Sequence, residues 1–211
     1  MQQRAERTIA GPAMGRRAVS RKRWNSTDLS LIAVFAALVA ALSIVPGIPV
    51  GPLGVPVTLQ TLGVLLAGVV LGPARGTAAV LLYLAAGFIG LPVFSGFSGG
   101  FGVLAGPSAG YLLAFPLAAL VAGALSVVVI RRNPRRRAAL LFGSCLVASL
   151  LTIHPLGVAG LMINAGLPLR EAMMVDAAYL PGDVLKNVLV AGLALSVHRA
   201  FPRLLSAPRR S

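Results

Sequence analysis

Apolar residues run through this chain in long stretches, and short groups of turn residues separate one stretch from the next. Six such segments cover residues 29–46, 58–72, 76–91, 108–130, 138–163 and 173–198. A run of about 20 apolar residues can cross a bilayer as a helix, because a helix satisfies its backbone polar groups internally. The pattern therefore predicts an all-α integral membrane protein with six transmembrane helices in one bundle.

Two details of this pattern concern the ends and lengths of the helices. Residues 58–72 and 76–91 are shorter than a full span, so one of these two segments is expected to be tilted or partly re-entrant. Thr27 or Asp28 is expected to cap the first helix, because small polar side chains satisfy the free N–H groups of a helix start.

Composition agrees with a membrane protein: 57% of the 211 residues are hydrophobic and 11% are charged, with a mean hydropathy of +0.87. The net charge of +14 would suggest a nucleic-acid partner. However, the basic residues gather at segment edges without interleaved aromatic residues, so a lipid bilayer and no nucleic acid is expected. The single cysteine, Cys145, excludes an intrachain disulfide and a multi-cysteine metal cluster.

The positions of the basic residues predict an orientation. If six helices are threaded, the N-terminal arm, Arg75, the arginines of 131–137 and the C-terminal tail fall on one side, whereas 47–57 and 92–107 contain no charged residue. The positive-inside rule makes the basic side cytoplasmic, with both termini. The predicted division is a basic, disordered arm over 1–28, a membrane domain over 29–198 and a basic cytoplasmic tail over 199–211.

Two ionisable residues three positions apart in an apolar stretch, Asp183 and Lys186, are the strongest candidates for a functional site. Either charge alone at bilayer depth costs roughly 2.5–3.5 kcal/mol on insertion scales. Helical spacing places Tyr179 and Asn187 on the same face. These groups suit a neutral ligand head with N–H and C=O groups, or a carboxylate. The alternative is a structural ion pair that neutralises itself across one turn.

Neutral polar residues follow the first outer connection, which is too rich in proline to be helical. Thr58, Gln60 and Thr61 stand at the start of the second segment. Ligand contact and an ordinary turn with Thr58 as a helix cap are both open.

The second outer connection, residues 90–111, interleaves glycines with Phe94, Phe97 and Phe101 and ends at Tyr111. Glycine lets the backbone approach a ligand closely, and aromatic rings can cover the apolar face of a small ring system. The alternative is a close-packed, re-entrant plug.

Three further features have weaker signals. Asp176 is expected to be an exposed carboxylate near the outer interface, and His154 a hydrogen-bonded packing histidine, with ligand contact as its alternative. Ala33, Ala37 and Ala41 recur every four residues, which flattens one face of the first helix and indicates close contact with another helix.

At these residues the chain resembles the BioY family, the biotin-specific substrate-binding component of energy-coupling-factor (ECF) transporters. The matching stretches lie in order between 29 and 198 and are Pro56-Val-Thr-Leu-Gln-Thr-Leu62, Gly72-Pro-Ala-Arg-Gly76, Gly90-Leu-Pro-Val-Phe-Ser-Gly-Phe-Ser-Gly-Gly100, Gly106-Pro-Ser-Ala-Gly-Tyr111 and Pro181-Gly-Asp-Val-Leu-Lys186. The chain departs from the family at Ser108-Ala109, where Thr-Gly is commoner, and in an aromatic residue displaced to Tyr179.

The resemblance implies a multi-pass subunit of the cell membrane that captures biotin on the outer side. It also implies partners, a transmembrane coupling subunit and two ABC ATPases, and no cofactor. The chain itself has no P-loop. The alanine face is then expected to hold the coupling subunit. The residues expected to bind substrate are Asp183, Lys186, Asn187, Tyr179, Phe94, Phe97, Tyr111, Gln60 and Thr58.

Two other classes of protein are alternatives to this interpretation. A pore or purely structural membrane subunit explains the hydrophobicity but does not require a polar pair beside an aromatic-glycine loop. The alternative function is that of another membrane carrier or pore for a small organic solute, working without ATPase partners. An enzyme is not expected, because the sequence has no His-Glu-x-x-His motif and its few carboxylates form no acidic metal cluster.

Overall fold

The structure is a computed structural model that describes residues 24–50, 55–132, 135–202 and 204–205. Most of the predicted arm, residues 1–23, and residues 206–211 of the predicted tail lie outside the described residues. The division of the chain into arm, membrane domain and tail therefore stays a prediction.

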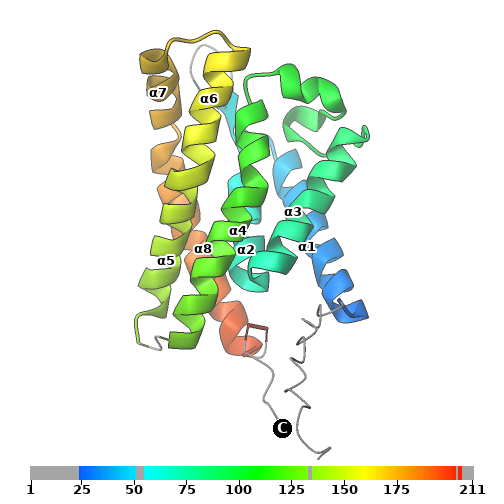
Figure 1. Ribbon diagram of the computed structural model, residues 1–211, viewed down its shortest axis with the longest axis vertical. Helices are drawn as coiled ribbons and strands as arrows, with labels where there is room; N and C mark the ends of the chain where they lie inside the picture. The colour runs from blue at the N-terminus through cyan, green and yellow to red at the C-terminus, as the bar shows by residue number, and fades with distance from the viewer. Residues whose placement is uncertain (1–23, 51–54, 133–134, 203, 206–211) are drawn as a thin grey trace, which may run out of the picture.

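Helices dominate the described residues and run side by side as one bundle (Figure 1). Their bounds are α1 Ser26–Ile44, α2 Gln60–Leu71, α3 Pro73–Phe88, α4 Ala109–Arg132, α5 Arg137–Ala148, α6 His154–Asn164, α7 Leu169–Ala177 and α8 Leu180–Ala200. A π-helical turn, Ser149–Ile153, joins α5 to α6. Each of the six predicted segments thus contains helix.

Four of the described helices are long and apolar enough to cross a membrane: α1, α4, α8 and the continuous helix Arg137–Asn164. Several such helices in one chain make a multi-pass membrane protein. The predicted count of six spans depends on α2 and α3, which have 12 and 16 residues, and stays a prediction.

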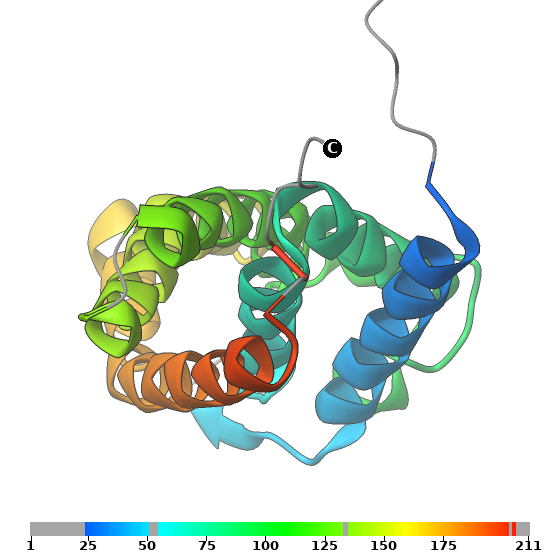
Figure 2. The same cartoon turned by 90° about the horizontal axis from the view of Figure 1, so that it is seen from below.

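The shortness of α2 has a structural explanation, because this helix lies in the middle of the bundle (Figure 2). It packs against α1, α3, α4 and α8, and every one of its residues except Thr61 is buried. A helix that is surrounded by protein need not match the thickness of the bilayer, since neighbouring chain can satisfy its ends.

A small antiparallel hairpin precedes α2, where the sequence predicted only a non-helical connection. Strand β1, Ile48–Val50, pairs with β2, Val55–Val57, in a register that places Ile48 opposite Val57. The all-α prediction therefore misses one two-stranded sheet. Both strands of such a hairpin are edges, and an edge strand tolerates proline because its N–H can point away from the partner.

The predicted cap of α1 is wrong by two or three positions. The N-cap residue is Asn25, whose side-chain oxygen accepts a hydrogen bond from the backbone N–H of Asp28 at 2.8 Å. The Asp28 carboxylate in turn accepts from the backbone N–H of Asn25 at 3.2 Å. This reciprocal pair is a capping box, in which the acid belongs to the third helical position and not to the cap.

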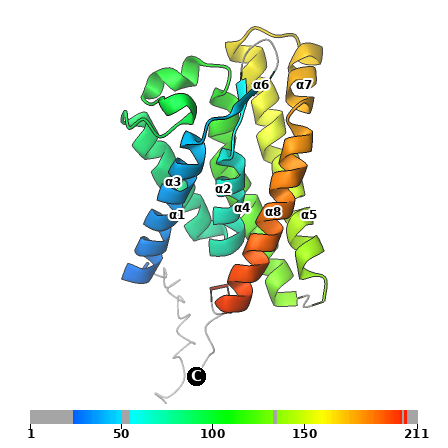
Figure 3. The same cartoon turned by 180° about the vertical axis from the view of Figure 1, so that it is seen from behind.

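The start of α1 and the chain after α8 lie at the same end of the bundle (Figure 3). Arg75 links them: its guanidinium contacts the Asp28 carboxylate at 3.2 Å and donates to the Leu204 carbonyl at 2.6 Å. It also donates to the Leu71 carbonyl at 3.2 Å. The hairpin and residues 90–108 lie at the opposite end. Which end faces the cytoplasm stays a prediction.

Candidate ligand-binding site

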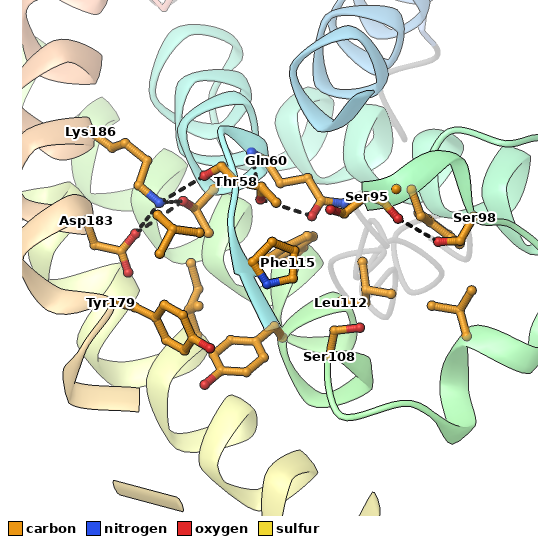
Figure 4. Close-up of a pocket in the computed structure, with 18 residues that line it drawn as sticks. Thr58, Gln60, Ser95, Ser98, Ser108, Leu112, Phe115, Tyr179, Asp183 and Lys186 are labelled. Atoms are coloured by element: carbon orange, nitrogen blue, oxygen red, sulfur yellow. Dashed lines mark hydrogen bonds and ion pairs between the residues drawn. The ribbon is translucent and has the colours of Figure 1, made fainter. Parts of the chain in front are cut away.

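A cavity of about 330 Å³ lies at the hairpin end of the bundle (Figure 4). Its walls come from β2, the start of α2, two short 3₁₀ turns at Ser95–Phe97 and Phe101–Ala105, α4 and the start of α8. The polar lining residues are Thr58, Gln60, Thr61, Ser95, Ser98, Ser108, Tyr111, Tyr179, Asp183 and Lys186. The cavity has the size and the mixture of apolar and polar groups of a small-molecule site.

The predicted charged pair lies in the wall of this cavity. The ammonium Nζ of Lys186 is 2.6 Å from Oδ1 of Asp183, and it also donates to the Thr61 hydroxyl at 2.9 Å and to the Thr58 carbonyl at 3.1 Å. The Thr61 hydroxyl lies 3.3 Å from the same Asp183 oxygen. Lysine has three donors, and three acceptors surround it here.

Burial makes this pair energetically important. Asp183 is 6% exposed and Lys186 is 7% exposed. Charges removed from water interact strongly, and removing one partner leaves the other uncompensated. The pair therefore joins α8 to the start of α2 and sets the charge of the cavity wall.

The local sequence explains why the pair stands at the beginning of α8. Pro181 occupies the first turn, where its missing N–H costs no helical hydrogen bond. Asp183 follows in the same turn, where a carboxylate interacts favourably with the helix N-terminus. Lys186 stands three residues further on, so both side chains share the face that meets α2.

Gln60 and Thr58 fix the neighbouring wall. The side-chain amide of Gln60 donates to the Tyr83 hydroxyl at 2.5 Å, and that hydroxyl lies 3.2 Å from the Val93 carbonyl. The Thr58 hydroxyl accepts from the backbone N–H of Gln60 at 3.3 Å. It thus satisfies a donor of the first turn, although the N-cap position itself is Leu59. Sequence reasoning missed Tyr83, because a single tyrosine in an apolar segment does not by itself indicate a site.

The structure separates Phe94 from Phe97, two of the three phenylalanines of the glycine-rich connection. Phe94 is buried, lines the cavity and meets the rings of Tyr83 and Phe88 edge to face at 5.5 and 5.4 Å between centroids. Gly87 permits this contact, because a Cβ there would collide with the Phe94 ring. Phe97 is 64% exposed and is not among the lining residues. Its predicted ligand contact stays a prediction.

Tyr111 and Tyr179 lie together on another side of the cavity, with ring centroids 5.8 Å apart and nearly perpendicular planes.

Asn187 stands behind the ion pair: it is 1% exposed, and neither polar atom of its side chain has a hydrogen-bond partner among the described residues. Its predicted contact with a ligand stays a prediction.

Asp176 is the clearest correction to the sequence analysis. This residue is 7% exposed and is not an exposed carboxylate. Its Oδ2 lies 2.8 Å from Nδ1 of His154, and its Oδ1 accepts a hydrogen bond from the Tyr111 hydroxyl at 2.8 Å. His154 is hydrogen-bonded, as expected, but its partner is this buried acid. The contact exists because α7 folds back against α6, which no local pattern predicts.

The alanine face of α1 lies on the outside of the bundle. Ala33, Ala37 and Ala41 are exposed, whereas Ala36 and Val39 on the other side are buried. The small residues of this face are thus not used for packing between described helices, and a flat strip of surface remains.

The fold defines a multi-pass helical membrane protein, and its cavity carries a buried charged pair in one wall. The family model described as "BioY family" matches residues 16–203. The chain belongs to the BioY family.

Relatives support the same assignment over most of the chain. "Biotin transporter BioY" of Rhizobium etli is 38% identical over 182 residues, which are 85% of this chain and 97% of the relative. The protein of the same name from Rhodobacter capsulatus is 42% identical over 189 residues, with the same two coverages. Both names describe transporters, in agreement with the prediction that the chain is not an enzyme.

A solved structure resembles this fold. The crystal structure of the S-component for biotin from an ECF-type ABC transporter superimposes with a TM-score of 0.76 at 28% identity. The match covers 82% of this chain and 91% of the other. The bundle described above is therefore the fold of a known substrate-binding component.

Proposed function

We propose that this chain captures biotin at the outer face of the cell membrane, as the substrate-binding component of an ECF-type, ATP-driven transporter. The observation that carries the proposal is the buried Asp183–Lys186 pair in the wall of a solute-sized cavity, in a chain whose relatives are named biotin transporters. The end of the bundle with Arg75 faces the cytoplasm, and the hairpin end faces outward.

The cavity offers a chemical partner for each part of biotin. Asp183 accepts hydrogen bonds, as ureido N–H groups require, and Lys186 donates to a ureido oxygen or a carboxylate. Phe94 and Tyr111 supply flat apolar faces for the sulfur-containing ring. A ligand that bonds to Lys186 would take the place of the Thr58 carbonyl, so binding is expected to loosen the contact between α8 and the hairpin.

Equilibrium binding by the purified protein tests this function. We expect saturable, one-to-one binding of biotin and no binding of thiamine or riboflavin at the same concentrations, since the polar groups and volume of the cavity suit a small bicyclic urea. Folded protein that shows no saturable biotin binding would contradict the proposal and favour a carrier or pore for another solute.

The exposed alanine face of α1, formed by Ala33, Ala37 and Ala41, is proposed to contact the transmembrane coupling subunit. Small side chains let two helix backbones approach closely, which is how helices associate when lipid offers no hydrophobic driving force. The face lies outside the cavity lining, so partner contact and ligand contact are separate on this surface.

Ala37→Leu is expected to reduce co-purification with the coupling subunit by about tenfold or more, because a single large side chain prevents close packing of the two helices. Biotin binding by the isolated chain should persist. Ala124→Leu is the matched control, since Ala124 is an exposed alanine on α4. Loss of biotin binding with assembly unchanged would instead make α1 part of the ligand site.

A further inference from the structure

A second acid–base pair lies behind the cavity, formed by His154 at the start of α6 and Asp176 near the end of α7. Nδ1 of His154 is 2.8 Å from Oδ2 of Asp176, and Nε2 is 3.5 Å from Oδ2 of Asp183. The side chains of all three residues are less than a tenth exposed. His154 therefore stands between two buried carboxylates on different helices.

Both carboxylates are connected to the lining of the cavity. Asp183 lines it and holds Lys186. Asp176 accepts the hydrogen bond of Tyr111, whose ring also lines the cavity. A change at His154 would therefore reach two cavity walls, although His154 itself is not among the lining residues.

The protonation state of the imidazole ring decides how it interacts with the two carboxylates, Asp176 as a hydrogen-bond partner and Asp183 as an ion-pair contact at 3.5 Å. A neutral ring has one N–H donor and one nitrogen with a lone pair, so it can donate to only one of the two acids. The protonated ring donates from both nitrogens. The Ser149 hydroxyl, 3.3 Å from Nε2, can donate or accept and does not decide between these states.

Charge balance favours the protonated ring. The described ionisable groups around His154 are Asp176 on α7 and Asp183 and Lys186 on α8, with the hydroxyls of Tyr111 and Tyr179 beside them. Two carboxylates and one ammonium leave one excess negative charge in a buried cluster. The imidazolium removes this excess, and an uncompensated buried charge is strongly unfavourable.

We propose that His154 is a positioning residue of the ligand site: as an imidazolium that donates to Asp176 and forms an ion pair with Asp183, it holds Asp183 and Tyr111 in the arrangement that receives the ligand. Biotin affinity then depends on the proton of His154. This inference rests on the proposed function, in which biotin is the ligand. When the proton leaves, the ring loses the positive charge that pairs with Asp183, so affinity falls as the pH rises.

Biotin binding by the full-length purified protein, measured from about pH 5.5 to pH 9.5, tests the proposal. The carboxyl group of biotin stays ionised throughout this range, so the ligand itself does not titrate. We expect the affinity of the parent to fall by about tenfold to a hundredfold as the pH rises, the size of a lost charged hydrogen bond. His154→Gln should bind more weakly at low pH and show no such step.

Two further variants make the test specific. His198→Gln is the matched control, because His198 is the other histidine of the chain and its Nε2 lies 3.1 Å from the Val69 carbonyl near the far end of α8. It should keep the parent profile. Asp176→Asn keeps a side chain of similar shape without its charge, and its pH profile should differ from that of the parent.

The possible failures are distinguishable. A parent affinity that stays flat over this pH range, or an Asp176→Asn profile identical to that of the parent, overturns the role of His154 and leaves biotin binding intact. A pH step that is lost in His198→Gln also overturns it. Absence of biotin binding at every pH contradicts the proposed function instead.

Discussion

Lys186→Met is expected to weaken biotin binding by a factor of about 100 to 4,000, the equivalent of roughly 3–5 kcal/mol for breaking a buried charge pair. Methionine keeps the length of the side chain and removes the ammonium that contacts Asp183, Thr61 and the Thr58 carbonyl. The measurement is equilibrium binding, with thermal unfolding of the same samples to report stability.

A double variant separates a ligand site from a structural ion pair. Asp183→Asn combined with Lys186→Met removes both charges, and replacing both members of a buried pair by neutral groups often restores stability. We expect the unfolding temperature to recover toward that of the parent while biotin binding stays lost. Recovery of both properties would show that the pair is structural.

The control for this experiment is an ion pair far from the cavity, Asp28 with Arg75. Asp28→Asn weakens the contact between Asp28 and Arg75 at the opposite end, and asparagine can still accept the capping hydrogen bond from the Asn25 N–H. Biotin affinity should remain within about twofold of the parent, because Asp28 and Arg75 lie at the opposite end of the bundle and are not among the residues that line the cavity.

Sustained accumulation of biotin should require ATPases that this chain does not encode. A binding protein alone concentrates its ligand only by occupancy, whereas accumulation against a gradient needs a coupled source of free energy. The chain has no Gly-x-x-x-x-Gly-Lys-[Ser/Thr] motif with which to bind ATP phosphates. We expect uptake in cells that cannot make biotin to be high when the coupling subunit and ATPases are present. Without them, the amount of biotin in the cells should be close to the amount that the protein itself binds.

A matched strain should carry the complete set of subunits with the P-loop lysine of the ATPases replaced. Its accumulation should fall to that of the chain alone, because this lysine holds the β- and γ-phosphates. Equal accumulation in all strains, insensitive to depletion of ATP, would contradict the ATP-coupled transporter and favour a self-sufficient carrier.

The parts of the site that sequence predicted are those set by local spacing. Asp183 and Lys186 are three positions apart on a helix, so their contact follows from helix geometry. The six helical segments likewise follow from runs of apolar residues, which carry the information for a membrane helix within each run. Thr58 and Gln60 were found because polar groups are rare in these segments.

The parts that sequence did not predict depend on contacts between distant segments. Asp176 looked like an interfacial acid because nothing near it in the chain indicates His154 or Tyr111 as a partner. The hairpin before α2 was missed because its prolines argue against a strand, although an edge strand can accommodate them. Phe94 and Phe97 stand three positions apart with similar neighbours, and only the path of the loop separates the buried ring from the exposed one.

The position of α2 has a consequence for how the protein is made. A helix of 12 residues is too short to settle across a bilayer alone, and Gly72 alone separates it from α3. Because α4 and α8 pack against α2 and follow it in the chain, α2 can be fully enclosed only after both of them have been synthesised. The centre of the bundle is therefore completed late, when the ribosome has already made most of the chain.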